Sequence, residues 1–195
     1  MGEGRLMTIW FTSDSHFGHD KDFIYQARGF NSIQEHDEAI IERWNSVVKP
    51  DDTVYHLGDA MMGRNYSYGI NCLRRLNGTI YIIRGNHDTV TRWEEYEDQW
   101  PHIVITGWSY VLKRDGYPKL YLCHYPTITS CLENDKPLKN QLLSLHGHTH
   151  SKKKFEFENP YMYNVALDAH DCYPISIDEV VIDIEKRVEY CRKYK

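Results

Sequence analysis

The chain has 195 residues, of which 41% are hydrophobic and 26% are charged, and its formal net charge is −5. This length and composition are typical of a globular protein that buries a sizeable core unaided. A negative net charge provides no general attraction to nucleic acid or to an anionic membrane. No apolar run reaches the roughly 18 residues that a membrane-spanning helix needs. We therefore expect no membrane association and no stable complex with nucleic acid.

The N-terminal residues and the cysteines favour one cytoplasmic domain. Residues 1–6 lack the apolar stretch of a signal peptide and are interpreted as an extension, and residues 1–195 are expected to form a single domain. The five cysteines are scattered and include no Cys-x-x-Cys pair. This spacing argues against a disulfide framework or a zinc knuckle, and reduced thiols are the simplest interpretation. The sequence predicts no particular oligomeric state.

Strands and helices alternate in the first half of the chain. Strands are expected at 6–11, 53–57 and 79–83, and helices at 33–48, 66–76 and 91–99. Ser32 and Glu35 have the spacing of a capping box at the start of the first helix. This alternation predicts a parallel sheet, in which the carboxyl ends of the strands meet along one edge where ligands bind.

The second half has the pattern of an antiparallel or mixed sheet. Strand-like alternation covers 103–113 and 118–123, and Asp115-Gly116 between them is a strong hairpin signal. Further strands are expected at 141–145 and 161–167. Ser176 and Glu179 then have capping-box spacing and predict a C-terminal helix.

Polar side chains directly follow several predicted strands. Gly85-Asn86-His87-Asp88 follows the apolar run 79–83, and aspartates follow the two earlier strands. Histidines follow the later strand-like runs in the same way. The candidate ligands collected in this manner are Asp14, His16, Asp59, Asn86, His124, His148 and His150. One zinc ion needs about three or four ligands, so this larger set suits two cations that share a carboxylate.

Asp59 is the best candidate for the shared ligand, because in chain order it lies between Asp14/His16 and Asn86/His124. Carboxylate, imidazole and amide oxygen together suit manganese, iron or zinc better than calcium. Two divalent cations, two aspartates and one hydroxide would leave a charge of about +1 to attract a phosphate. A hydroxide bridging the metals would attack phosphorus in line with the leaving oxygen.

His87 is not needed as a ligand. Its imidazole is free either to stabilise charge in the transition state or to protonate the leaving group, and Asp88 is expected to orient it. Each motif also has a structural alternative: alone, Asp14 and Asn86 would be interpreted as helix caps or turn residues. His56 lies inside a strand and is expected to be a packed core residue.

Several residues beside these motifs are weaker candidates for binding the substrate. His19 can face the substrate or hold a loop by a hydrogen bond. Arg64 and Asn65 can bind phosphate oxygens or belong to a solvated loop, and Tyr125 can stack on a substrate. The run Lys152–Lys154 can contact a polyanion, although a solvated turn is the favoured interpretation.

In chain order, Asp-x-His, Gly-Asp, Gly-Asn-His-Asp, a lone histidine after a strand and Gly-His-Thr-His resemble the five blocks of the calcineurin-like metallophosphoesterases. The match runs from Asp14 to His150 and is specific because all five blocks occur in this order. The resemblance implies a four-layer α/β/β/α sandwich, with two mixed sheets flanked by helices and an open site without a cap domain. It further implies one metal held by Asp14, His16, Asp59 and His150, a second held by Asp59, Asn86, His124 and His148, and His87 as the acid.

The sequence thus predicts a dinuclear metal-dependent phosphoesterase that hydrolyses a phosphomonoester or a phosphodiester. Two divalent ions are expected, with manganese first and iron, zinc or nickel as alternatives. The expected partner is a phosphate ester, and nucleotides are among the candidates. Two other functions stay open: a catalytically silent scaffold of the same fold, which retention of every ligand disfavours, and a nuclease, which the negative net charge disfavours.

Overall fold

The computed structural model describes residues 7–63, 65–129 and 137–194. The strands in this part of the chain are β1 (Ile9–Thr12), β2 (Thr53–His56), β3 (Thr79–Ile83), β4 (Ile103–Gly107), β5 (Ser109–Leu112), β6 (Lys119–Cys123), β7 (Leu142–His146), β8 (Met162–Asn164) and β9 (Ile175–Ser176). They form one sheet in the order β4-β3-β2-β1-β9 and a second in the order β5-β6-β7-β8. In the first sheet only β9 runs antiparallel to its neighbour, and in the second only β5 does.

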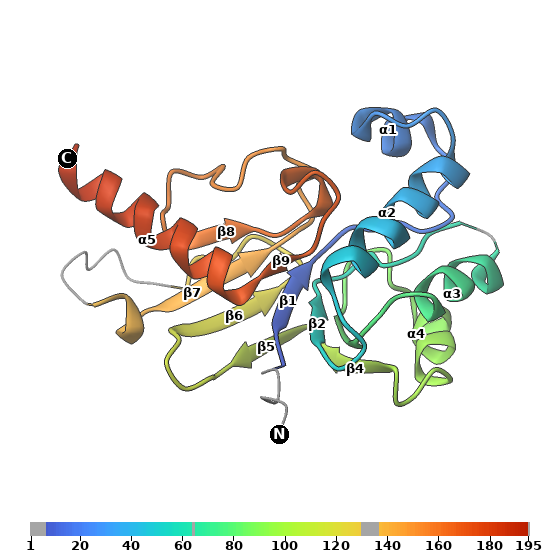
Figure 1. The fold of residues 1–195 in the computed structure, drawn as a ribbon, viewed down its shortest axis with the longest axis horizontal. Coiled ribbons are helices and arrows are strands. Elements are labelled where there is room, and N and C mark those ends of the chain that lie inside the picture. Colours follow the sequence, from blue (N-terminus) through green and yellow to red (C-terminus); the bar gives the residue numbers. More distant parts are fainter. Residues whose placement is uncertain (1–6, 64, 130–136, 195) are drawn as a thin grey trace, which may run out of the picture.

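Helices lie on both sides of the paired sheets. They are α1 (Asp22–Tyr25), α2 (Ile33–Val47), α3 (Tyr66–Arg74), α4 (Val90–Glu97) and α5 (Ile177–Lys193), with short 3-10 turns η1 (Gln26–Arg28), η2 (Leu138–Asn140) and η3 (Leu167–Ala169). Helices α2, α3 and α4 flank the first sheet, and α5 lies along the second (Figure 1). The predicted fold class, two mixed sheets flanked by helices, is confirmed.

Side-chain caps start the two longest helices. The Ser32 hydroxyl accepts a hydrogen bond from the Glu35 backbone N–H at 3.1 Å, but the Glu35 carboxylate turns to Asn31, so only half of the predicted capping box forms. At α5, both halves form between Ser176 and Glu179. Such caps contribute about 1 kcal/mol each and explain why these helices begin where they do.

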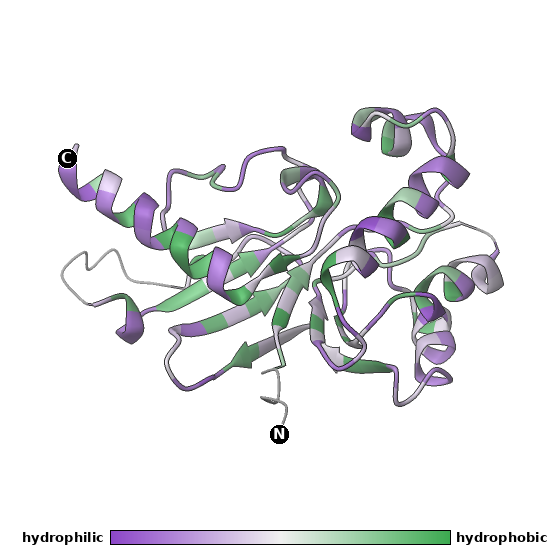
Figure 2. Cartoon of the chain, in the orientation of Figure 1, coloured by the Kyte–Doolittle hydropathy of each residue, from purple (hydrophilic) through white to green (hydrophobic). Residues whose placement is uncertain are grey.

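Two apolar clusters hold the layers together. One packs α2, α3 and α4 against the first sheet and includes Trp44 and Ile80. The other joins the facing sides of the two sheets to α5 and includes Phe11, Leu122 and Val180. Figure 2 shows hydrophobic residues along the central strands and helices that combine hydrophobic and hydrophilic residues. Fully burying one such side chain contributes about 1.5–3 kcal/mol, so the clusters are the main stabilising element of the fold.

The strand-like stretch 103–113 divides between the two sheets. Residues up to Gly107 pair with β3, whereas Ser109 onward pairs with β6. Gly107 has a φ of 101°, a left-handed conformation that turns the chain from one sheet to the other. The predicted hairpin around Asp115-Gly116 joins β5 to β6 and is confirmed. The predicted strand 161–167 is shorter than expected and ends at Asn164.

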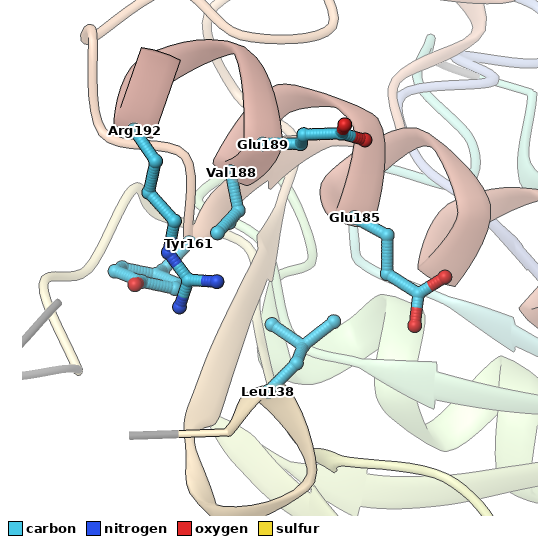
Figure 3. A pocket seen from close by; sticks show the side chains of 6 residues that line it. All are labelled: Leu138, Tyr161, Glu185, Val188, Glu189 and Arg192. Atoms are coloured by element: carbon cyan, nitrogen blue, oxygen red, sulfur yellow. The ribbon is translucent and has the colours of Figure 1, made fainter. Parts of the chain in front are cut away.

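A pocket of about 250 Å³ lies between α5 and η2 (Figure 3). Its lining residues are Leu138, Tyr161, Glu185, Val188, Glu189 and Arg192. None of the predicted site residues lines it, so the predicted site lies elsewhere. Among the described residues, no helix combines the length and the apolar character required to cross a membrane.

Candidate metal centre

The topology brings the predicted ligands to one edge of the molecule. Asp14, Asp59 and Asn86 follow β1, β2 and β3, which run parallel and in register. His124 and His148 follow β6 and β7, which are also a parallel pair. The carboxyl ends of both sets of strands therefore meet where the two sheets adjoin, as expected for a ligand site in an α/β fold.

The first donor group contains Asp14, His16 and His150. The Nε2 atoms of His16 and His150 lie 3.2 Å apart. Oδ1 of Asp14 lies 3.8 Å from Nε2 of His16 and 3.7 Å from Nε2 of His150. Donor atoms that bind one metal at about 2.1 Å lie roughly 3–3.5 Å from one another. The distances among these three atoms are close to the distances expected for ligands of one cation. Together, Asp14, His16 and His150 offer a set of ligand atoms for one metal ion.

The second donor group contains Asn86, His124 and His148. Oδ1 of Asn86 lies 2.8 Å from Nε2 of His124 and 2.9 Å from Nδ1 of His148. The two imidazole nitrogens are 3.2 Å apart. These three atoms have the spacing of donors that face a shared cation.

Asp59 lies between the two groups. Its Oδ2 atom is 3.8 Å from Nε2 of His16 and 3.5 Å from Nε2 of His124. Its Oδ1 atom accepts a hydrogen bond from the His87 backbone N–H at 2.8 Å, which fixes the orientation of the carboxylate. Burial raises the pKa of Asp59 to about 7, so an ionised carboxylate is costly here unless a cation compensates it.

Two further observations show that this donor set fits divalent cations. Oδ1 of Asp14 is buried without a hydrogen-bond partner, a condition that ordinarily costs about 1–3 kcal/mol. The pKa of His16 lies well below its usual value, chiefly because of burial and then because of the nearby His150. A neutral imidazole retains the lone pair that a metal ligand needs. A cation at this position would satisfy both groups.

Five candidate ligands have left-handed backbone conformations. Their φ angles are 61° at Asp14, 49° at His16, 55° at Asp59, 70° at His148 and 51° at His150. Residues with a side chain adopt this region at a cost on the order of 1–3 kcal/mol, and such strain concentrates at functional sites. The concentration of strained residues at this edge therefore supports a functional site.

Two glycines allow the motifs to approach one another. A Cβ atom on Gly147 would collide with Oγ of Ser13 and Oδ2 of Asp14, and one on Gly85 would collide with the backbone and carboxylate of Asp59. In the folded chain, the Asp14 carboxylate instead accepts a hydrogen bond from the His148 N–H at 2.9 Å. The glycines of the sequence motifs are thus required by close packing between the motifs.

His87 and Asp88 have different surroundings. The His87 ring is partly exposed, and its centroid lies 5.8 Å from that of His16. The Asp88 carboxylate is buried and accepts hydrogen bonds from the backbone N–H groups of Asp59 and Gly85, each at 2.8 Å. No described hydrogen bond joins the Asp88 and His87 side chains. Orientation of His87 by Asp88 therefore gains no support from these contacts.

Two of the weaker candidates lie beside the donor groups. The His19 ring centroid is 5.3 Å from that of His16, and the His19 N–H also donates to the His16 carbonyl at 2.9 Å. The hydrogen bond comes from the backbone, and Nδ1 of the His19 ring is buried without a partner, so both roles considered from the sequence stay predictions. The Tyr125 ring packs edge-on against His124 and His148, at centroid distances of 5.2 Å and 4.9 Å, and is 38% exposed.

The remaining weaker candidates are Asn65, Arg64 and the run 152–154. The Asn65 side chain accepts a hydrogen bond from the Tyr68 N–H at 3.1 Å and caps α3. Arg64 lies outside the described residues. In the run 152–154, the ammonium group of Lys154 pairs with Asp183 of α5 at 2.8 Å. Lys154 therefore contacts α5, while Lys152 lines a pocket beside Asp168.

Sequence reasoning missed three side chains that support the donor groups. Asp168 contacts His150, Arg28 contacts Asp168 and the Asp14 carbonyl, and the buried Tyr96 hydroxyl donates to Asp88 at 3.0 Å. The one sequence signal for any of these three residues was the position of Asp168 in the segment after the last motif. The other two occur in helical or loop sequence without a distinctive pattern.

The comparisons with known proteins agree with this geometry. The family model described as calcineurin-like phosphoesterase matches residues 7–182. An uncharacterised protein of Methanocaldococcus jannaschii is 32% identical over 186 residues, which cover 93% of each chain. The Gene 66 protein of Mycobacterium phage D29 is 30% identical over 203 residues, covering 93% of this chain and 99% of the phage protein. A crystal structure of a protein of unknown function from Aquifex aeolicus has a similar fold, with a TM-score of 0.68, 24% identity, and coverage of 90% of this chain and 98% of that chain. The chain belongs to the calcineurin-like phosphoesterase family.

Proposed function

We propose that this protein is a dinuclear metal-dependent phosphoesterase that hydrolyses a phosphomonoester or a phosphodiester. The observation that carries the proposal is the position of Asp59, whose Oδ2 atom lies 3.8 Å from a nitrogen of the first donor group and 3.5 Å from one of the second. Membership of the phosphoesterase family supports the reaction class.

The residues divide into two sets around Asp59. Asp14, His16 and His150 would hold one cation with it, and Asn86, His124 and His148 would hold the other. Manganese is the first candidate for this mixture of oxygen and nitrogen donors, and iron, zinc and nickel are the alternatives. Bound there, two divalent ions supply Lewis-acid stabilisation of phosphoryl oxygens and lower the pKa of water. The two aspartates supply the negative charge that balances part of the charge of the cations.

His87 is the proposed proton donor to the leaving group. Its backbone N–H donates to the Asp59 carboxylate, so the turn after β3 that carries the imidazole is tied to the shared ligand after β2. Burial, and then the positive charge of Arg92, lower the pKa of His87. A lowered pKa makes the imidazolium a stronger acid, and it also reduces the fraction of His87 that carries the proton near neutral pH.

The proposed substrate is a phosphate ester whose leaving group lies over the exposed rim of the site. Tyr125 packs beside His148 of the second donor group, and His19 packs beside His16 of the first. An aromatic surface next to a phosphate site suits a nucleotide ester, because a base can stack on such a ring.

The direct test is to measure metal content and hydrolysis together. The purified protein is incubated with manganese, its bound metal is measured by plasma mass spectrometry, and bis-p-nitrophenyl phosphate and p-nitrophenyl phosphate are assayed. We expect two metal equivalents and hydrolysis of at least one ester. Failure to bind metal together with failure to hydrolyse either ester would contradict the proposal.

Asp59→Asn tests the shared ligand. The amide would place an N–H₂ group where the shared oxygen lies, so we expect loss of paired metal binding and of hydrolysis. Asp183→Asn is the matched control, since Asp183 pairs with Lys154 away from the donor groups. A wild-type protein that binds two metals but hydrolyses neither ester nor any of a panel of nucleotides would favour a silent scaffold.

A further inference from the structure

Asp168 lies directly behind the first donor group. Its Oδ2 atom lies 3.0 Å from Nδ1 of His150, while Nε2 of the same ring faces His16 at 3.2 Å. Because a carboxylate only accepts hydrogen bonds, this contact assigns a proton to Nδ1, and in the neutral ring the lone pair then lies on Nε2. The contact therefore selects the tautomer in which His150 presents a donor atom toward Asp14 and His16.

Arg28 fixes Asp168 and Asp14 at the same time. Its Nε donates to Oδ1 of Asp168 at 3.0 Å and its Nη2 donates to Oδ2 at 2.8 Å. Nη2 also donates to the backbone carbonyl of Asp14 at 2.7 Å. The side chains of Arg28 and Asp168 are 2% and 5% exposed. A bidentate pair this well buried has little freedom to move, so it ties residues separated by 140 positions into one unit.

The network continues to the loop that carries His16. Nη1 of Arg28 donates to Nε2 of His36 at 2.9 Å, and Nδ1 of His36 donates to Asp37 at 2.7 Å. The second oxygen of Asp37 accepts a hydrogen bond from the backbone N–H of Gly18 at 2.9 Å. The chain of contacts thus reaches the first donor group from two directions, through His150 and through the loop after His16.

The second donor group has a different kind of support. Nδ1 of His124 lies 2.7 Å from the backbone carbonyl of Leu57, and Nδ1 of His148 already faces Asn86. The network from Arg28 to Asp37 makes no described direct hydrogen bond with these residues, and it meets the second group through Asp14, whose carboxylate accepts from the His148 N–H. Asp168 itself contacts only His150 among the proposed ligands in the described hydrogen bonds, so removing its carboxylate should act chiefly on the first group.

We propose that Asp168 and Arg28 are positioning residues that set the affinity of the first donor group for its cation. This inference rests on the proposed function, because it assumes that the donor groups hold metal. Asp168 selects the tautomer and orientation of His150, and Arg28 holds both Asp168 and the strained backbone at Asp14.

The test is a manganese titration of metal-free wild-type protein and Asp168→Asn by isothermal calorimetry. We expect one of the two sites to weaken by about 10–100-fold and the other to change by less than about twofold. Hydrolysis by Asp168→Asn should return at saturating manganese, since the ligands themselves are unchanged. Asp183→Asn, which removes a carboxylate from the Lys154 pair, should bind both cations as tightly as the wild type.

A second variant keeps the test decisive if Asp168→Asn does not fold, as judged by far-ultraviolet circular dichroism. Arg28→Lys retains the positive charge and loses the bidentate geometry, so it should weaken the same single site. Equal weakening of both sites, or unchanged affinity at both in the folded variant, would overturn the inference.

The two proposals fail in different ways. If the wild type binds two cations and hydrolyses no ester, while Asp168→Asn loses affinity at one site, the inference is supported and the proposed function is contradicted. If the wild type hydrolyses esters and the variant binds both cations normally, only the inference is overturned. A wild-type protein that binds no cation contradicts both.

Discussion

The carboxylate of Asp88 accepts a hydrogen bond from the backbone N–H of Asp59 at 2.8 Å. The same oxygen accepts from Gly85, and the other oxygen accepts from the hydroxyl of Tyr96. Asp88 therefore joins the Gly-Asn-His-Asp turn to the residue proposed to bridge the two cations. The structure gives this carboxylate a part in placing Asp59, which differs from the role in orienting His87 that its position beside His87 suggested.

Asp88→Ala should lower metal content as well as stability. The substitution leaves two buried N–H groups without an acceptor, at about 1–3 kcal/mol each. Tyr96→Phe removes a single hydroxyl hydrogen bond from the same carboxylate and should cost about 1 kcal/mol with metal content unchanged. Urea unfolding and plasma mass spectrometry measure the two effects. Wild-type metal content in Asp88→Ala with a reduced kcat would instead show that Asp88 acts through His87.

His87→Ala should keep both metals and lower the rate in a way that depends on the leaving group. For an alkyl ester we expect a loss of about 10²–10⁴-fold, because the departing alkoxide needs a proton. For a p-nitrophenyl ester the loss should be much smaller, because that leaving group departs without protonation. Steady-state kcat values for the two esters, with metal content as the control, make the comparison. Equal losses for both esters would contradict the role as acid.

Gly147→Ala should abolish hydrolysis by displacing Asp14. The added methyl group would occupy the position of the Asp14 carboxylate and the Ser13 hydroxyl. Gly116→Ala is the matched control: Gly116 has a φ of +85° and open space around it, so alanine there costs about 1–2 kcal/mol of strain without touching the site. Activity and thermal unfolding are measured for both. An active Gly147→Ala protein would show that the close approach is dispensable.

His56 should make the protein less stable in mild acid. Burial lowers the pKa of His56 to about 4. Its Nδ1 atom is buried without a hydrogen-bond partner, so a proton added there would find no acceptor. The unfolded chain takes up this proton near pH 6.5, so stability is lost as the pH falls from about 6.5 to 4, by up to roughly 3 kcal/mol. Above that range the residue is neutral in both states and contributes no pH dependence.

His56→Phe tests this pH dependence. Phenylalanine keeps a ring against Trp44, whose ring centroid lies 6.5 Å away, and it cannot titrate. The variant loses the hydrogen bond to Ser15 at every pH, so the informative quantity is the slope of unfolding free energy against pH. We expect a shallower slope between pH 4 and 6.5 than in the wild type, measured by urea denaturation. An unchanged slope would assign the acid sensitivity to the other buried histidines.

The sequence was sufficient to locate most of the strands, the long helices and the five motifs, although it did not indicate the short strand β9. Periodicity and capping residues are local properties, and so is the occurrence of polar residues at strand ends. For this reason the strand 79–83, the cap at Ser176 and the hairpin at Asp115-Gly116 appear where they were expected. Knowing that parallel strands end at one edge was also enough to expect Asp14, Asp59 and Asn86 together.

The tertiary structure alone decided how the motifs are supported. The pairing of Arg28 with Asp168 spans 140 positions, and that of Asp59 with Asp88 spans 29. No periodic pattern encodes such contacts, because they depend on which loops adjoin after the sheets have packed. The same holds for the division of 103–113 between two sheets and for the left-handed backbone at five candidate ligands. The sequence by itself determined which donor atoms are present, and only packing decided which of them face one another and what holds them there.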